Sequence, residues 1–156
     1  MSRFATMRES VQDECVKQSG AIPYRTKGDG GLEVLLVTAK RDGMWIIPKG
    51  HIEPDMLSGD SAAKEVWEEA GVKGRVSNQA VTAFSYRRMG RRYEVEVFIL
   101  EVRDVFDEYP ERGHRRREWM SLDEACSRLV SVDLKAAVRD LPRIAASMRA
   151  DASEKP

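Results

Sequence analysis

The chain has 156 residues, enough for one domain with a hydrophobic core. Its 26 Lys and Arg residues balance its 26 Asp and Glu residues, so no net field argues for a nucleic-acid or membrane partner. Hydrophobic residues make up 42% and charged residues 33%, which is a globular composition. No apolar run approaches the ~20 residues of a membrane helix, and no N-terminal apolar block resembles a signal peptide.

The two cysteines, Cys15 and Cys126, stand far apart and belong to no CxxC motif or Cys/His cluster. Free thiols in a reducing compartment fit this pattern better than a disulfide or a zinc site. We therefore expect a cytoplasmic protein. We expect a flexible arm over residues 1–15, one domain over 16–150 and a mobile tail over 151–156.

The first half of the domain predicts three strands. Residues 16–26 are mixed in polarity and contain Pro23, which favours an edge strand over a central one. Residues 32–39, LEVLLVTA, form a short apolar run typical of a buried strand. Residues 44–48, MWIIP, predict a further short strand that ends at a proline.

A helix is expected over residues 60–70. Ser58 or Asp60 is its candidate N-cap, and Gly71 stands at the position where a left-handed C-cap glycine ends a helix. After it, residues 76–88 and 91–104 predict two strands joined by a turn around Gly90.

The last part of the domain predicts one strand and two helical segments. Residues 118–120 predict a short strand, and the following helix opens at Ser121 with Glu124 three residues on, which is a capping box. Residues 132–149 have helical periodicity, and Pro142 is expected to kink or divide that helix. Strands flanked by helices at both ends predict an α+β fold with a mixed sheet between helical layers.

Three glutamates crowd the end of the 60–70 helix. Glu65, Glu68 and Glu69 are spaced i, i+3 and i+4, so they share one helix face. Like charges at these spacings repel one another, and the C-terminal half of a helix disfavours negative charge. Either a solvated acidic face or an all-oxygen site for a hard divalent cation explains them.

The stretch from Gly50 to "KEVWEEAGV" (64–72) resembles the signature of the Nudix hydrolases, with no insertion between its parts. The resemblance implies an α/β/α sandwich and hydrolysis of a nucleoside diphosphate linked to another group. It also implies that Glu65, Glu68 and Glu69 bind Mg²⁺, or Mn²⁺, together with the backbone carbonyl of Lys49.

Two positions depart from that signature. Met56 stands where the family has an isolated glutamate, and Lys64 stands where it has an arginine. These two family residues form an ion pair, and losing both leaves neither charge stranded. We therefore expect catalysis to survive, although the geometry of the loop is open. A catalytically impaired module that binds phosphate ligands is the alternative.

The segments "PKGHIEP", "WEEAGVKG" and "RRREWMSLDEA" make residues 18–130 similar to the diphosphoinositol polyphosphate phosphohydrolase branch and its bacterial relatives. "PKGH" is also similar to the diadenosine tetraphosphate hydrolases. The resemblance implies a polyphosphorylated small-molecule substrate, with nucleotide sugars and capped RNA as alternatives. The substrate-binding residues that we expect are Arg25, Arg41, Lys49, Gly50 and Arg87.

In the expected mechanism, a carboxylate activates a water molecule that attacks the diphosphate. Glu65 and Glu68 are the candidates within the box, and Glu94 or Glu96 on the following strand is an alternative outside it. Residues 87–92, RRMGRR, contain no aromatic residue for stacking bases, so a nucleic-acid partner is not expected. We expect a monomer or a homodimer, and no membrane partner.

Overall fold

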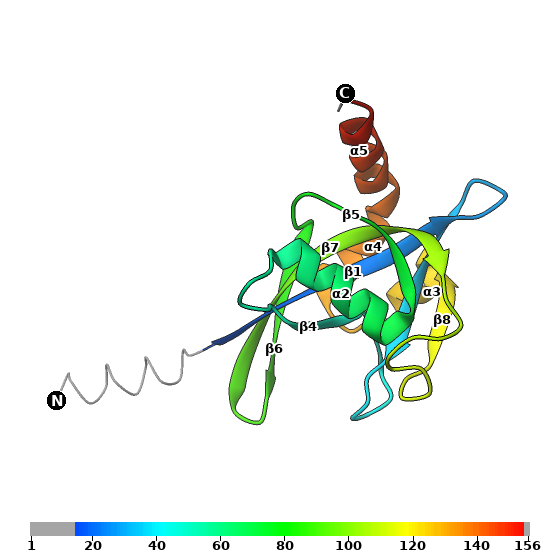
Figure 1. Ribbon diagram of the computed structural model, residues 1–156. Helices are drawn as coiled ribbons and strands as arrows, with labels where there is room; N and C mark the ends of the chain where they lie inside the picture. Colours follow the sequence, from blue (N-terminus) through cyan, green and yellow to red (C-terminus); the bar gives the residue numbers. More distant parts are fainter. Residues whose placement is uncertain (1–14, 155–156) are drawn as a thin grey trace.

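The computed structural model describes residues 15–154, and the expected arm and the end of the expected tail lie largely outside these residues. A sheet lies between helix α2 on one face and helices α3, α4 and α5 on the other (Figure 1). This arrangement confirms the expected α/β/α sandwich. The strands are β1 (Cys15–Thr26), β2 (Leu32–Thr38), β3 (Trp45–Ile46), β4 (Lys49–His51), β5 (Val72–Val76), β6 (Thr82–Arg88), β7 (Arg91–Val105) and β8 (Arg117–Ser121). The helices are α2 (Ser58–Ala70), α3 (Leu122–Arg128), α4 (Val132–Arg139) and α5 (Leu141–Glu154).

The sheet is mixed, with the order β3-β2-β1-β7-β5 along its main path. Strands β1 and β7 pair in parallel, and every other pairing is antiparallel. Strand β4 pairs with β1, β6 with β7, and β8 with β2. Strand β4 thus brings the start of the glutamate motif against the middle of the sheet.

The prediction that residues 16–26 form an edge strand is wrong, because β1 lies between β7 and the β2/β4 side. Pro23 is tolerated there by a gap in the pairing. Strand β4 ends its pairing at Gly20, and β2 begins at Tyr24. Because the amide of Ala21 faces this side and bonds to Pro48, the missing amide of Pro23 faces the gap.

The prediction of one strand over 76–88 is also wrong, because residues 77–81 separate β5 from β6. The Ser77 hydroxyl accepts a hydrogen bond from the Ile99 amide at 3.2 Å and donates one to the Gln79 carbonyl at 3.0 Å. This local side-chain bonding competes with the strand ladder. The turn predicted around Gly90 is confirmed, and both Met89 (φ 52°) and Gly90 (φ 79°) have the positive φ of a tight hairpin.

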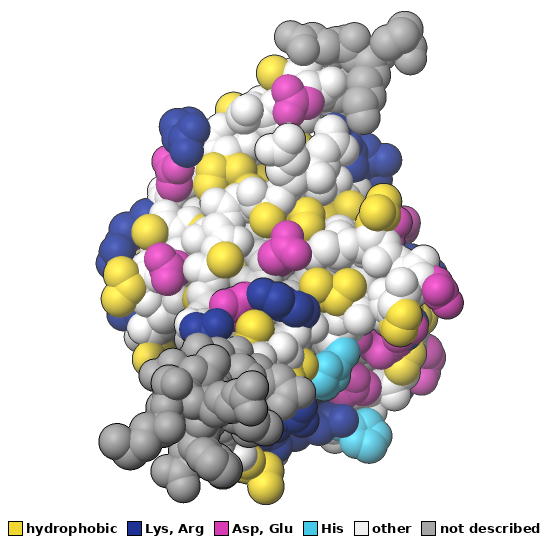
Figure 2. Space-filling view, turned by 90° about the vertical axis from the view of Figure 1, so that its left-hand side faces the viewer, with side chains coloured by type: hydrophobic (Ala, Val, Ile, Leu, Met, Phe, Trp, Pro, Cys, Tyr) yellow, Lys and Arg dark blue, Asp and Glu magenta, His cyan; other side chains and the backbone are white. Residues whose placement is uncertain are grey.

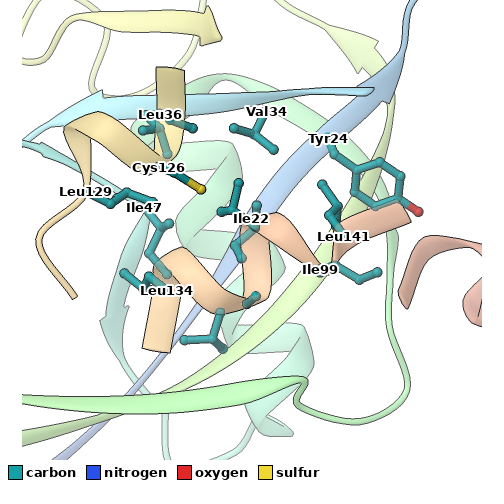
Figure 3. Packing of buried hydrophobic residues seen from close by; sticks show 14 of the residues in the cluster. Ile22, Tyr24, Val34, Leu36, Ile47, Ile99, Cys126, Leu129, Leu134 and Leu141 are labelled. Carbon is teal, nitrogen blue, oxygen red and sulfur yellow. The ribbon is translucent and has the colours of Figure 1, made fainter. Parts of the chain in front are cut away.

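Two hydrophobic cores lie on the two faces of the sheet. The larger core joins β-strand residues such as Ile22 and Ile99 to Leu134 and Leu141 of α4 and α5 (Figure 3). The smaller core packs Val66 and other α2 residues against the opposite face. Alternate residues of each strand therefore serve opposite cores, and this fixes the register of the strands under α2.

The N-terminal end of α2 differs from the prediction, and its C-terminal end agrees with it. Leu57 is the N-cap and makes no side-chain cap bond, so neither Ser58 nor Asp60 caps the helix. Gly71 is the left-handed C-cap, as predicted, with φ 69°. The Arg117 guanidinium donates to the Ala70 carbonyl at 2.8 Å and ties this helix end to β8.

The C-terminal helical region is divided, as Pro142 indicated. Helix α4 ends at Arg139, and Pro142 is the second residue of α5, where its missing amide costs no helical bond. Helix α5 continues to Glu154, beyond the start of the tail expected at 151. The predicted cap of α3 is confirmed, because Ser121 accepts from the Glu124 amide. None of the helices within residues 15–154 is long and apolar enough to cross a membrane.

Candidate active site

A cleft of about 570 Å³ opens where β4 meets the sheet and the C-terminal half of α2. Glu65 and Glu69 of the acidic cluster line it, together with Lys49 and Gly50. The remaining lining residues are Gln18, His51, Ile52, Glu53, Pro54, Tyr86, Arg88, Tyr93 and Arg115. On the face shown in Figure 2, acidic and basic side chains are intermingled.

The carboxyls of Glu65 and Glu69 both line this cleft and lie close enough to affect one another's pKa. Glu65 fills the space beside Gly50, where an added Cβ would lie 2.3 Å from its carboxyl carbon. Glu69 is 4% exposed and accepts a bond from the Lys49 amide at 3.3 Å. Burial raises the pKa of both carboxyls, that of Glu69 to about 8.

The third glutamate is turned away from this pair. Glu68 contacts the Lys64 ammonium at 3.1 Å, and Lys64 also donates to Glu53 at 2.6 Å. Within residues 15–154, no three acidic, His or Cys side chains come together as a group that could hold a metal ion. The structure thus brings two of the three predicted metal ligands together and pairs the third with a lysine.

The expectation that the family's ion pair is lost on both sides is wrong. Met56 carries no charge, but Lys64 forms an ion pair with Glu53 instead. The Met56 amide bonds to the Glu53 carbonyl at 3.1 Å, which closes a turn and brings Glu53 back toward α2. The loop and the helix are therefore still joined by an ion pair, displaced by three residues.

Arg115 supplies a fixed positive charge next to Glu69. Its Nη2 atom lies 3.6 Å from a Glu69 oxygen, and its Nε atom donates to Glu111 at 3.2 Å. Glu111 also contacts Lys40 at 2.9 Å, and its backbone amide donates to the Glu68 carbonyl. Burial would raise the pKa of Glu111, but the bonds from Lys40 and Arg115 outweigh it and lower that pKa.

Two stacked tyrosines form one wall of the cleft. The rings of Tyr86 and Tyr93 have centroids 4.9 Å apart and are almost parallel. The Lys49 ammonium lies over Tyr86 and contacts its hydroxyl at 3.0 Å. The basic turn 87–92 contains no aromatic residue, but the structure places this aromatic pair directly beside it.

An apolar pocket of about 420 Å³ adjoins the cleft and shares Lys49, Tyr86 and Arg88 with it. Its walls are aromatic and aliphatic, with Trp45 and Phe84 on one side and the α3–α4 turn on the other. The other residues that line it are Ala39, Arg41, Asp42, Met44, Ile46, Ile47, Ser85, Arg87, Leu129, Val130, Ser131 and Leu134. The structure thus places the predicted phosphate-binding residues Arg41 and Arg87 at this pocket.

Some of the predicted residues lie elsewhere. Arg25 is seven positions along β1 from Gln18, which is about 23 Å in a strand. Its guanidinium bonds to Glu33 at 2.6 Å and lies over the Trp119 ring. Glu94 pairs with Lys17, and Glu96 accepts from the Ser58 hydroxyl at 3.2 Å, so neither lines the cleft.

Another hollow, about 660 Å³ in volume, lies between the 77–82 loop and helices α4 and α5. It is larger than the cleft, but none of the three glutamates of the motif lines it. The Asp140 and Arg143 side chains on its wall bond to one another. The chemistry of the molecule therefore centres on the smaller cleft.

Sequence reasoning did not single out Glu53, Tyr86 or Arg115 as parts of the site. Arg115 is one of three consecutive arginines, and nothing in the sequence separates it from its neighbours. Tyr86 and Tyr93 stand at equal distances from the turn at Met89 and Gly90. This symmetry was the one available signal, because residues placed so in a tight hairpin face one another.

The chain is similar to known proteins in both sequence and fold. The NUDIX domain family matches residues 17–141. Diphosphoinositol polyphosphate phosphohydrolase 2 from Rattus norvegicus is 31% identical over 112 residues, covering 70% of this chain and 60% of the relative. Nudix hydrolase 21, chloroplastic, from Arabidopsis thaliana is 37% identical over 111 residues, covering 68% of this chain and 56% of the relative. The chain thus spans about 60% of the length of these relatives.

Among solved structures, an Ap4A hydrolase from C. elegans in a binary complex has a TM-score of 0.68 with this chain and is 23% identical in sequence. The alignment covers 85% of this chain and 98% of that chain. A second structure of the C. elegans Ap4A hydrolase has a TM-score of 0.70 at 22% identity, covering 84% and 98% of the two chains. At this identity the likeness establishes the shared fold.

Proposed function

Because the chain belongs to the Nudix family, we propose that it is a pyrophosphohydrolase that depends on Mg²⁺, with Mn²⁺ as a substitute. Its substrate is a polyphosphorylated small molecule of the diphosphoinositol polyphosphate or diadenosine polyphosphate type. The observation that carries this proposal is that half-buried Glu65 and buried Glu69 line a cleft together with the basic side chains of Lys49 and Arg88.

The residues present fit a hard divalent cation. The Glu65 and Glu69 carboxylates offer only oxygen donors, and Glu69 is too buried to be solvated as an isolated anion. Glu68 would complete the set if its side chain left Lys64, and the carbonyl of Lys49 is the proposed backbone ligand. A bound Mg²⁺ would offset the charge of the diphosphate and lower the pKa of a bound water molecule.

Glu65 is the proposed general base, with Glu68 as the second candidate. Glu65 lines the cleft and is held against the backbone at Gly50, whereas Glu68 faces Lys64. The place of Glu65 in the cleft beside Glu69 puts it within the site where the water would be activated. Glu65 therefore takes the proton of the attacking water, and Lys49 and Arg88 hold phosphate oxygens beside it.

The apolar pocket favours the diadenosine polyphosphate type over the inositol type. Its Trp45 and Phe84 side chains offer flat apolar surfaces, and Lys49 and Arg88 stand where the pocket joins the cleft. A phosphate chain that crosses this junction would place a base in the pocket and its diphosphate beside the glutamates. An inositol ring, which carries charged groups on every side, gains little from such walls.

The test is a hydrolysis screen with Mg²⁺ over diphosphoinositol polyphosphates, diadenosine polyphosphates, nucleotide sugars and capped RNA. We expect turnover in the first two classes and a loss of about 10³-fold or more in Glu65→Gln and Glu69→Gln. Glu108→Gln is the matched control, because Glu108 is a surface carboxylate that pairs only with Arg112 among the described residues. Turnover that persists in Glu69→Gln, or requires no divalent cation, would overturn the proposal.

We also propose that the protein acts in the cytoplasm. Cys15 and Cys126 are both free thiols, which fits a reducing compartment.

A further inference from the structure

The Arg115 guanidinium is held by three different parts of the fold. Its Nη1 atom donates to the Thr38 carbonyl of β2 at 3.2 Å, and its Nε atom donates to Glu111 at 3.2 Å. Its Nη2 atom is left facing Glu69 of α2 at 3.6 Å. The carbonyl of the next residue, Arg116, accepts from the Thr38 amide, and the Arg116 amide donates to the Thr38 hydroxyl. Arg115 is therefore a fixed cation, oriented before any ligand arrives.

The two cations beside the acidic cluster differ in freedom. The Lys64 side chain is 41% exposed and joins carboxylates that are themselves in contact with water. The Arg115 side chain is 13% exposed, and its partner Glu69 is 4% exposed. Solvent screens the first contact strongly and the second weakly, so Arg115 is the charge that acts on the centre of the cleft.

A fixed cation at this place has two opposing effects. It orients Glu69, because Nη2 of Arg115 contacts Oε2 of that carboxylate while the Lys49 amide donates to Oε1. It also repels any divalent cation that binds the same carboxylate, since both positive charges share one weakly screened site. A polyanionic substrate brings further negative charge and reverses that balance.

From this geometry we infer that Arg115 is the positioning residue of the metal site: it orients Glu69 and keeps divalent-cation binding weak until a phosphate-bearing substrate is present. This inference rests on the proposed function for the identity of the site. Its first test nevertheless needs no substrate and no turnover.

Removing the charge of Glu111 should change metal affinity in the opposite direction to removing the charge of Arg115. Glu111 neutralises part of the Arg115 charge and is itself held by Lys40 at 2.9 Å. Removing the Glu111 charge leaves Arg115 more strongly positive toward Glu69. Removing the Arg115 charge leaves the carboxylates more attractive to a cation. The two variants should therefore shift metal binding in opposite directions.

The measurement is isothermal titration of Mn²⁺ into the substrate-free protein. Arg115→Met should bind Mn²⁺ more tightly than the wild type by on the order of tenfold, and Glu111→Gln should bind it more weakly. Arg115→Lys keeps the charge and should stay within about twofold of the wild type. Arg112→Met is the matched control, because Arg112 lies in the same loop and pairs with the exposed Glu108.

The rate of diadenosine tetraphosphate hydrolysis distinguishes the effect of the Arg115 charge from the effect of its fixed orientation. Both Arg115→Met and Arg115→Lys should lose about tenfold or more in kcat, because a lysine cannot hold Thr38, Glu111 and Glu69 at once. Thermal unfolding shows whether each variant is folded. If Arg115→Met does not fold, Arg115→Lys and Glu111→Gln still test the inference.

Two results would overturn the inference. One is Mn²⁺ affinity in Arg115→Met that is unchanged or weaker, and the other is a wild-type kcat in Arg115→Lys. If Arg115→Met does not fold, the inference is contradicted when Glu111→Gln binds Mn²⁺ as tightly as the wild type or more tightly. Failure of the proposed function looks different, because the wild-type protein would then bind no Mn²⁺ and hydrolyse none of the screened substrates.

Discussion

Lys64 bonds to Glu53 at 2.6 Å, so the ion pair that position 56 cannot supply is rebuilt three residues earlier. The same ammonium reaches Glu68 at 3.1 Å. One lysine therefore joins the loop before α2 to the acidic face of that helix. This relationship makes the two departures from the family signature compatible with a working site.

Glu53→Gln should lower kcat severalfold, because Lys64 then loses its loop partner and draws Glu68 more strongly. Adding Met56→Glu to Glu53→Gln should restore most of the activity by returning the carboxylate to the family position. Steady-state kinetics on the best substrate of the screen measure both effects. A double variant no better than the single one would show that the Lys64 pair does not support catalysis.

Gly50→Ala should reduce turnover about 10²-fold. The added Cβ would lie 2.3 Å from the carboxyl carbon of Glu65, so the side chain must leave its place beside the backbone. Gly28→Ala is the matched control, because nothing lies within 4 Å of a Cβ at that glycine. Equal kcat values in the two variants would contradict the assigned place of Glu65.

The raised pKa of Glu69 predicts a pH dependence of stability in the metal-free protein. The pKa of Glu69 is raised from 4.5 to about 8 by burial, with Glu65 adding to the rise and Arg115 opposing it. Between these values the folded state binds more protons than the unfolded state, so the free energy of unfolding falls as pH rises. This contribution is fully present below about pH 4.5 and is lost as pH passes about 8.

Thermal unfolding of the metal-free protein from pH 5 to 9 measures this effect. The wild type should lose stability toward pH 9, and Glu69→Gln should flatten that part of the curve because a neutral amide has no proton to lose. Saturating Mg²⁺ should also remove the loss, since the cation then takes the place of the proton. The same slope in Glu69→Gln would rule out Glu69 as its source.

The apolar pocket predicts a substrate-dependent effect of Val130→Glu. Val130 is 70% exposed and lines the pocket, so a carboxylate there would repel phosphates and spoil the apolar wall. The KM for diadenosine tetraphosphate should rise about tenfold, with little change for a diphosphoinositol polyphosphate. Val132→Glu is the control, because Val132 is 79% exposed and does not line the pocket. Equal KM values in both variants would remove the pocket from the substrate site.

The sequence predicted the parts of the fold that depend on local chemistry. Gly71 ends α2, Ser121 caps α3 and Pro142 divides the last helices, since each of these depends on backbone geometry within a few residues. The place of β1 could not be predicted in this way. It depends on parallel pairing with β7, which is distant in sequence, and on a gap between β2 and β4 that accommodates Pro23.

The spacing of the glutamates in the sequence revealed the acidic cluster, but it did not predict their burial or their partners. Like charges at i, i+3 and i+4 left two explanations open, a solvated acidic face or a site for a divalent cation. The structure shows two cations beside the cluster, Lys64 at Glu68 and Arg115 at Glu69, and burial that raises the pKa of Glu69. These depend on burial and on a loop more than forty residues away, neither of which a helix pattern contains.

Titration of Mn²⁺ into the wild-type protein and into Glu69→Gln at pH 8 tests the central claim most directly. The account predicts saturable binding by the wild type, accompanied by proton release, and loss of that binding in the variant. Indistinguishable titrations, or no uptake by the wild type even with a polyphosphate substrate present, would contradict the assignment of this cleft as a metal-dependent active site.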